Sequence, residues 1–150
     1  MFTYVMLGST DLERSRRFYD RSLAPLGISR CGPQNDPGWE DIAGWGVYED
    51  DGAVELALWV CKPFDGRPAT VGNGTMVALK ADSWDAVRAF YQAALENGGT
   101  SEGEPGLRGH YAADFFAAYV RDPDGNKLAA VCRGFVAEQA AAAALSSQAG

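Results

Sequence analysis

Residues 3–23 read TYVMLGSTDLERSRRFYDRSL, and residues 75–95 read TMVALKADSWDAVRAFYQAAL. A shift of 72 positions aligns these two stretches without a gap, and the alignment extends to residues 57 and 129. Thirteen of its 55 residue pairs are identical. Apolar residues, helix-capping residues and glycines occupy equivalent positions in both copies. The sequence therefore predicts an internal duplication, and this decides the fold before any single motif is weighed.

Each copy has the same order of secondary-structure signals. A short strand with alternating apolar residues is followed by a capping signal, a helix with a 3.6-residue apolar period, and a glycine that ends the helix. A Gly/Pro-rich loop comes next, and then two β-type runs. The predicted strands are 3–8, 45–49 and 54–61 in the first copy, and 75–80, 115–121 and 127–133 in the second. We predict a βαβββ module that is used twice.

These modules define the expected domain organisation. The first module covers residues 1–61 and the second covers residues 75–134, and a linker at 62–74 joins them into one domain over 1–134. Residues 135–150 form an Ala-rich tail, either an appended helix or a frayed end. The turn at residues 122–126 should connect the last two strands as a hairpin, although its Asp-x-Asp-x-Asn spacing superficially resembles a calcium loop.

Composition excludes several classes of function. The 150 residues carry a net charge of −7, which disfavours binding to nucleic acids and to anionic membranes and suits a neutral or cationic small molecule. His110 is the single histidine, so no site that needs two histidines from one chain is available. Three scattered cysteines and the lack of a long apolar run predict a reduced, soluble, cytoplasmic protein.

Sequence motifs in both modules resemble those of one known family. These motifs are the stretch 7–19, the turn 122–126 with the two residues after it, and Gly72-Asn73-Gly74-Thr75. Together they resemble the vicinal oxygen chelate superfamily, which includes glyoxalase I, bleomycin resistance proteins and extradiol dioxygenases. The resemblance covers about residues 2–134. It implies an α+β fold in which two tandem βαβββ modules form an open, eight-stranded, mixed, β-barrel-like cavity with flanking helices, and it implies a homodimer.

The resemblance also implies positions for a divalent metal ion, bound by the first and last strands of each module. The first-strand ligand, usually His, falls on Tyr4, and its repeat mate is Met76. The last-strand ligand, usually Glu, falls on Ala129, whose gap-free mate is Ala57, with Glu55 two residues earlier on the same strand face. A transition metal needs three or four oxygen, nitrogen or thiolate donors. We therefore expect no metal and no other cofactor.

Aromatic residues of the first module are candidates for lining the cavity. Trp59 shares strand parity with Glu55 and should face the cavity, whereas Trp45 and Tyr48 are either core or lining. Trp39 lies in a polar loop that is a candidate for the rim. The ligand-binding residues predicted from these considerations are Tyr4, Glu55, Trp59, Met76, Tyr111 and Ala129.

The loop at 107–114 gathers Arg108, His110, Tyr111 and Asp114. We expect it to border the mouth of the cavity, where it either orients a ligand carboxylate or lets His110 act as a general base that Asp114 orients. The alternative is a solvated loop without a function. His110 and Tyr4 are the only candidates for acid–base catalysis.

These observations predict a metal-free, small-molecule-binding protein of the glyoxalase/bleomycin-resistance type that sequesters a toxic or antibiotic compound. Two alternatives stay open. One is a glyoxalase- or dioxygenase-like enzyme with a divergent or absent metal site, and the other is a protein-interaction module. We expect a small-molecule ligand and a second copy of the chain as partners, and neither nucleic acid nor membrane.

Overall fold

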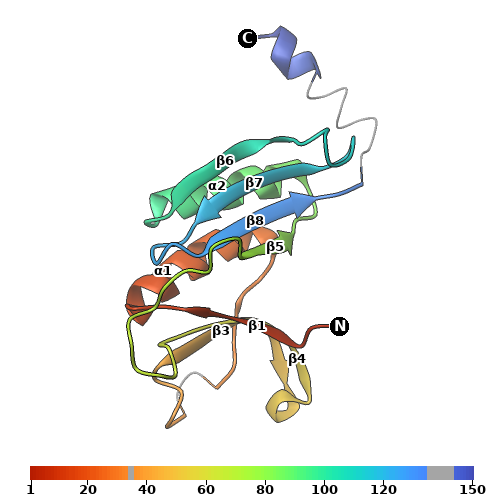
Figure 1. The fold of residues 1–150 in the computed structure, drawn as a ribbon. Coiled ribbons are helices and arrows are strands. Elements are labelled where there is room, and N and C mark those ends of the chain that lie inside the picture. The colour runs from red at the N-terminus through yellow and green to blue at the C-terminus, as the bar shows by residue number, and fades with distance from the viewer. Residues whose placement is uncertain (34–35, 135–143) are drawn as a thin grey trace.

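The computed structural model describes residues 1–33, 36–134 and 144–150. Its elements follow the two predicted modules (Figure 1). In chain order they are β1 (Tyr4–Gly8), α1 (Leu12–Leu23), η1 (Ala24–Leu26), β2 (Arg30–Cys31), β3 (Ile42–Glu49), η2 (Asp50–Gly52), β4 (Val54–Cys61), β5 (Met76–Lys80), α2 (Trp84–Glu96), β6 (Thr100–Leu107), β7 (Phe116–Arg121) and β8 (Lys127–Cys132).

Each module forms one four-stranded mixed sheet. The strand orders are β1-β4-β3-β2 and β5-β8-β7-β6. In each sheet the first strand of the module runs parallel to the last, and the other pairs are antiparallel. The α+β class and the tandem modules are therefore confirmed. The two sheets are separate and do not close into a barrel.

The duplication is visible in the positions of the elements. β1 and β5 begin 72 residues apart, at Tyr4 and Met76, and α1 and α2 begin 72 residues apart as well. The parallel pairing differs, however, because Tyr4 lies opposite Ala57 whereas Ala129 lies opposite Ala78. The second module is thus shifted by two residues. A shift of two keeps every side chain on its own face of the sheet.

Both helices begin at the predicted capping residues. The side chain of Asp11 accepts a hydrogen bond from the backbone N–H of Arg14, and that of Ser83 accepts one from Ala86, both at 3.0 Å. Each cap satisfies an amide that has no partner within its helix. Gly27 ends η1 in the left-handed conformation, with φ of +72°, as the predicted stop requires.

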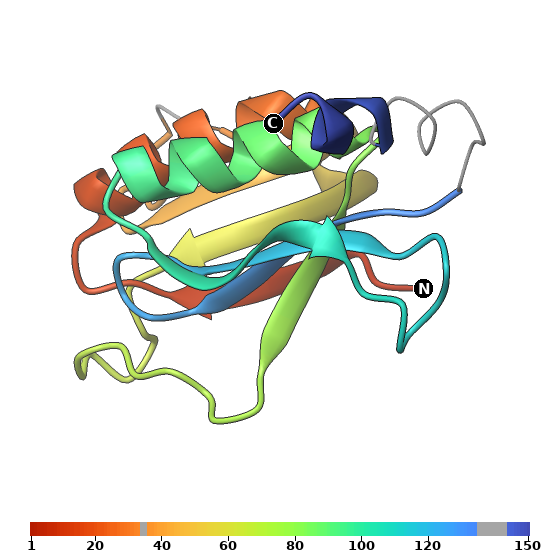
Figure 2. The same ribbon diagram turned by 90° about the horizontal axis from the view of Figure 1, so that it is seen from above.

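The core lies between the helices and the sheets. Figure 2 shows both helices on one side of the molecule and most of the strands on the other. α1 and α2 also contact each other and so join the two modules. Fully buried helix residues include Phe18, Tyr19, Leu23, Val87 and Phe90, and the strands add Leu58, Val60, Leu128 and Ala130. Odd and even positions alternate between this core and the opposite face of each sheet.

Two strands occupy segments that sequence patterns indicated as loops. β6 (Thr100–Leu107) contains Gly103, Pro105 and Gly106, which ordinarily disfavour a strand. It is an edge strand of its sheet, and its pairing with β7 is interrupted by two register shifts. An edge position tolerates proline because one side of the strand has no partner. β2 is only two residues long and is also an edge strand.

The turn at residues 122–126 joins β7 to β8, as predicted, and also connects the two modules. Asp124 Oδ1 accepts hydrogen bonds from the Thr10 backbone N–H at 2.9 Å and from the Thr10 hydroxyl at 2.7 Å. The hydroxyl of Tyr19 donates to Asp122 Oδ2 at 2.6 Å, and the amide nitrogen of Asn126 donates to the Gly8 carbonyl at 3.0 Å. The second module therefore binds the segment of the first module that directly precedes α1.

The predicted tail lies only partly within the described residues. Residues 135–143 are outside them, and residues 144–148 are helical. Over the described part of the chain, no helix has the length and apolar character to cross a membrane.

Candidate functional site

The positions at which the resemblance implies metal ligands are occupied by a poor donor set. Tyr4 and Met76 begin the two parallel strands and are 50% and 44% exposed. Ala129 is fully buried and offers only a methyl group, and Ala57 lies directly opposite Tyr4. A phenol and a thioether on separate sheets do not make a chelating site for a divalent transition metal.

Glu55, the carboxylate that strand parity places beside Ala57, already has a partner. The indole N–H of Trp59 donates to Glu55 Oε1 at 2.7 Å. Within residues 1–33, 36–134 and 144–150, no three His, Cys, Asp or Glu side chains are grouped closely enough to hold a metal ion. The residues present therefore do not fit the metal that the resemblance implies, and we derive no chemical step through one.

Trp59 is packed into an aromatic cluster on the face of the first sheet opposite to α1. Its ring lies 5.4 Å from that of Trp39 and 5.7 Å from that of Tyr48, and only 3% of the residue is exposed. The indole lies over Gly44, where an added Cβ would be 2.2 Å from the Trp59 ring. Trp59 therefore lies on the same face of the sheet as Glu55, and its side chain packs against other aromatic rings there. Trp45 packs instead in the core beneath α1.

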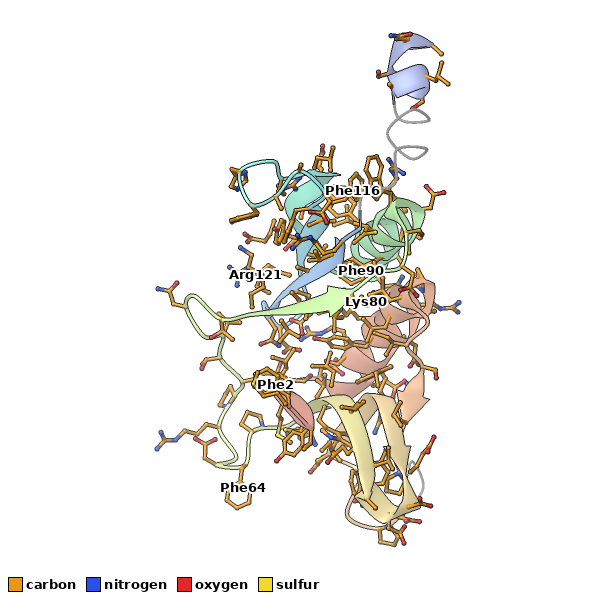
Figure 3. All side chains as sticks on the ribbon, turned by 90° about the vertical axis from the view of Figure 1, so that its right-hand side faces the viewer. Phe2, Phe64, Lys80, Phe90, Phe116 and Arg121 are labelled. Carbon is orange, nitrogen blue, oxygen red and sulfur yellow. The ribbon has the colours of Figure 1, made fainter. Side chains whose placement is uncertain are left out.

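A hollow lies on the corresponding face of the second sheet, the face away from α2. Its volume is about 850 Å³, and all four strands of the module contribute to it, together with the linker end and the loop after β6. We call it the module-2 hollow. It is lined by Asn73, Gly74, Thr75, Met76, Glu102, Gly103, Arg108, His110, Tyr111, Ala112, Phe115, Tyr119, Arg121, Lys127 and Arg133. Figure 3 shows Arg121 on the side of this sheet away from α2, and Phe90 on the helix side.

The module-2 hollow is basic although the chain as a whole is acidic. Four of the 13 Lys and Arg residues of the chain line it, against the single carboxylate of Glu102. Arg121 pairs with Glu102 at 2.9 Å and Lys127 approaches the same carboxylate at 4.0 Å. Arg121, acting first through its hydrogen bond, lowers the pKa of Glu102, so this carboxylate is ionised at neutral pH.

Arg108 has no carboxylate partner among the described residues. One of its Nη atoms donates to the Glu104 carbonyl at 2.6 Å, and its guanidinium lies 5.4 Å from the centre of the Tyr119 ring. Lys127 lies 5.6 Å from the same ring. Burial, followed by the proximity of Tyr111, raises the pKa of Tyr119, so its hydroxyl is protonated at neutral pH.

His110 and Tyr111 lie at the exposed rim of the module-2 hollow, with ring centres 4.1 Å apart. The predicted pairing of His110 with Asp114 is absent. Asp114 instead accepts three hydrogen bonds from Arg133, the shortest at 2.9 Å, and one from the Gly134 backbone N–H at 2.9 Å. The hydrogen bond from Arg133, with that from Gly134, lowers the pKa of Asp114. Among the described residues, therefore, Asp114 does not orient His110.

The three cysteines are weak candidates for a nucleophile. Cys31, Cys61 and Cys132 are free thiols, and burial raises the pKa of each. Since the thiolate is the reactive form, a raised pKa lowers their reactivity at neutral pH.

The family model for the Glyoxalase/Bleomycin resistance protein/Dioxygenase superfamily matches residues 2–130 of this chain. The chain belongs to this superfamily. The match covers both modules and agrees with the resemblance carried by the sequence motifs.

Solved structures agree with this assignment. A glyoxalase/bleomycin resistance protein from Albidiferax ferrireducens T118 is 36% identical, with a TM-score of 0.73, and the alignment covers 89% of this chain and 99% of that one. A glyoxalase I mutant from Zea mays is 28% identical, with a TM-score of 0.57, over 86% of this chain and 45% of that one. A glyoxalase-related enzyme from Fulvimarina pelagi, 19% identical with a TM-score of 0.64 over 89% and 88% of the two chains, shares the fold. No curated protein matches significantly.

The ligand-binding and catalytic residues predicted from the sequence do not form one site in this superfamily member, but lie in separate hollows or in the core. Met76 and Tyr111 line the module-2 hollow, as do His110 and Arg108 of the loop. Tyr4 lines a different, largely apolar hollow beside β5, and Ala129 is covered. Tyr119, Arg121 and Lys127 also line the module-2 hollow and were not among the residues predicted from the sequence. Strand parity was the available signal, because residues 119 and 121 alternate with the buried residues 118 and 120 of β7.

Proposed function

We propose that this superfamily member binds a small organic molecule without a metal ion, and that it sequesters a toxic or antibiotic compound. The proposal rests on the difference between two places in the structure. The four positions at which the family binds a metal ion do not supply a set of chelating side chains, whereas the module-2 hollow is open and has a volume of about 850 Å³. Ligand sites for compounds of this kind have about 300–1,000 Å³ and combine apolar walls with a few polar groups.

The lining residues support a binding role. Phe115, Tyr111 and Tyr119 provide aromatic surface, and Arg108 and Asn73 provide polar groups. We propose Met76 and Tyr111 as ligand contacts and Glu55 with Trp59 as a structural pair, since Trp59 is almost fully covered and hydrogen-bonded. Aromatic side chains contribute large contact areas to flat ligands.

A ligand screen by thermal shift tests the proposal. A compound that binds the module-2 hollow should raise the melting temperature, and Tyr111→Ala should abolish that rise. Tyr4→Ala is the matched control, because Tyr4 is also about half exposed but lines another hollow. A compound whose effect is lost in Tyr4→Ala and kept in Tyr111→Ala would contradict the proposed location.

The rival function is a glyoxalase- or dioxygenase-like enzyme with a divergent metal site. The likeness to a glyoxalase I from Zea mays favours this alternative. Elemental analysis of protein purified without chelator separates the two functions. The binding proposal expects less than a tenth of an equivalent of metal. One equivalent of Ni, Zn or Fe per chain, retained through dialysis, would refute it.

We also propose a cytoplasmic location and a homodimer. Three free thiols support a reducing compartment. Sedimentation equilibrium of the full chain tests the dimer, and a mass of 16.0 kDa at all concentrations would contradict it.

A further inference from the structure

We propose that the ligand of the module-2 hollow is an organic anion, a flat aromatic compound that carries a carboxylate or a similar acidic group, and that Arg108 is its anchor. This inference rests on the proposed binding function and names the class of ligand. It differs from the neutral or cationic ligand that the overall charge of the chain favours.

The charge around the module-2 hollow is the first support. The chain has a net charge of −7, yet four basic side chains and one carboxylate line this hollow. Basic groups that surround a concave surface raise the local concentration of anions and repel cations. A cationic ligand would find its only ionised partner, Glu102, already bound by Arg121 at 2.9 Å.

Among the four cations, Arg108 is the one left without an anionic partner in the described residues. Arg121 and Lys127 share Glu102, and Arg133 pairs with Asp114 at 2.9 Å. Arg108 donates only to a backbone carbonyl, that of Glu104. A guanidinium has five N–H donors in a fixed fork, so most of them stay available, and the fork matches a carboxylate.

The backbone around Arg108 is built to leave room for the guanidinium. An added Cβ at Gly103 would lie 3.3 Å from one Nη atom, and an added Cβ at Gly106 would lie 3.0 Å from the other. Side chains at either position would therefore press against the group. Gly103 also faces the Tyr119 ring, where an added Cβ would be 3.0 Å from Cδ2. The absence of side chains at Gly103 and Gly106 thus leaves space beside β6 for the Arg108 guanidinium.

Aromatic rings near Arg108 are the reason for proposing that the ligand is flat and aromatic. The Tyr119 ring lies 5.4 Å from the Arg108 guanidinium and 5.6 Å from the Lys127 ammonium, and the Phe115 ring lies 5.2 Å from that of Tyr111. These rings provide surfaces on which a planar compound can stack. The hydroxyl of Tyr119 makes no hydrogen bond to a described residue, and it is protonated, so it can donate to a second oxygen of the anionic group.

The test uses aromatic compounds in matched sets that differ only in charge. We suggest 2-naphthoate, 2-naphthamide and 2-naphthylmethylamine, together with benzoate, benzamide and benzylamine, measured on the full chain by ligand-observed NMR and calorimetry. The carboxylates should bind at least about tenfold more tightly than their amides, and the amines should bind weakest. Raising the salt concentration should weaken carboxylate binding.

Variants assign the effect to Arg108. Arg108→Gln should weaken carboxylate binding by about tenfold or more and leave amide binding unchanged, and Arg108→Lys should retain part of the preference. The control is Arg67→Gln, which removes an equal charge from an exposed linker residue. Circular dichroism and the melting temperature show that each variant folds.

The outcomes separate this inference from the proposed function. If amides or amines bind as tightly as the carboxylates, or if Arg108→Gln behaves like Arg67→Gln, the anion assignment is wrong although the protein binds small molecules. If no member of any set binds, the proposed binding function fails, and the inference fails with it.

Discussion

Asp124 connects the two modules, so Asp124→Asn should cause a large loss of stability. Its side chain is 4% exposed and accepts two hydrogen bonds from Thr10, one from Arg14 at 3.0 Å and one from the Ser15 hydroxyl at 3.3 Å. A hydrogen bond to a charged group contributes about 1.5–3 kcal/mol, and the half-exposed ion pair contributes less. Asparagine keeps one acceptor oxygen and loses the charge. The free energy of unfolding should therefore fall by about 2–3 kcal/mol.

The loss of stability caused by Asp124→Asn should be larger at neutral pH than in acid. Burial alone would raise the pKa of Asp124, but hydrogen bonds from the Thr10 backbone and side chain outweigh it, so the pKa lies below the ordinary value. Because the pKa of this carboxyl is lower in the folded state than in the unfolded state, its ionised form stabilises the fold. This stabilisation is complete above the pKa of an aspartate in the unfolded chain, about 3.9, and is lost as the pH falls through the pKa of the folded state. The difference between wild type and Asp124→Asn should be full at pH 7 and should shrink below about pH 4.

Urea and thermal unfolding measure this difference. A loss of 2–3 kcal/mol corresponds to a decrease in melting temperature of about 4–12 °C for a chain of this size. Asp85→Asn is the control, because Asp85 pairs with Arg88 at 2.9 Å but is 94% exposed, and its removal should change stability by less than about 0.5 kcal/mol. Equal effects of the two substitutions would refute the proposed connection.

Three further predictions concern the same fold. Tyr19→Phe removes the buried donor to Asp122 and should cost about 1–3 kcal/mol in urea unfolding, whereas Tyr91→Phe, at an exposed contact with Ser101, should cost less than half as much. Burial, followed by Asp122, raises the pKa of Tyr19, so the stability it provides is complete below about pH 10 and is lost as pH rises through the folded value. Wild type should therefore lose stability above pH 10 more steeply than Tyr19→Phe, and equal slopes would count against this cause. Gly44→Ala should displace the Trp59 ring, shift tryptophan fluorescence and cost about 1–3 kcal/mol, whereas Gly109→Ala, which has open space, should do neither.

The sequence was sufficient for the repeated framework because the apolar period and the capping residues act locally. Asp11 and Ser83 cap the helices where predicted, and β5 begins at Met76, the repeat mate of Tyr4. Local signals failed for β6 (Thr100–Leu107). Its Gly and Pro residues indicate a loop, and only the edge position in the folded sheet explains why a strand forms.

The candidate site was harder to predict because its residues come from four strands and a loop. Arg108 and Tyr111 were found through the density of polar groups in one loop. Tyr119 and Lys127 belong to strands whose exposed face is recognisable only once the core face is known. The partner of a polar residue was also not predictable, since Asp114 bonds to Arg133 and not to nearby His110.

The hydrogen bonds between Thr10 and Asp124 span 114 residues of sequence, which has a consequence for how the chain folds. The backbone amide and hydroxyl of Thr10, just before α1, leave the ribosome long before the carboxylate that accepts their hydrogen bonds. Contacts between such distant residues form late and slow folding. The first module should therefore stay loosely ordered during synthesis and complete its packing only after the final hairpin of the second module has been made.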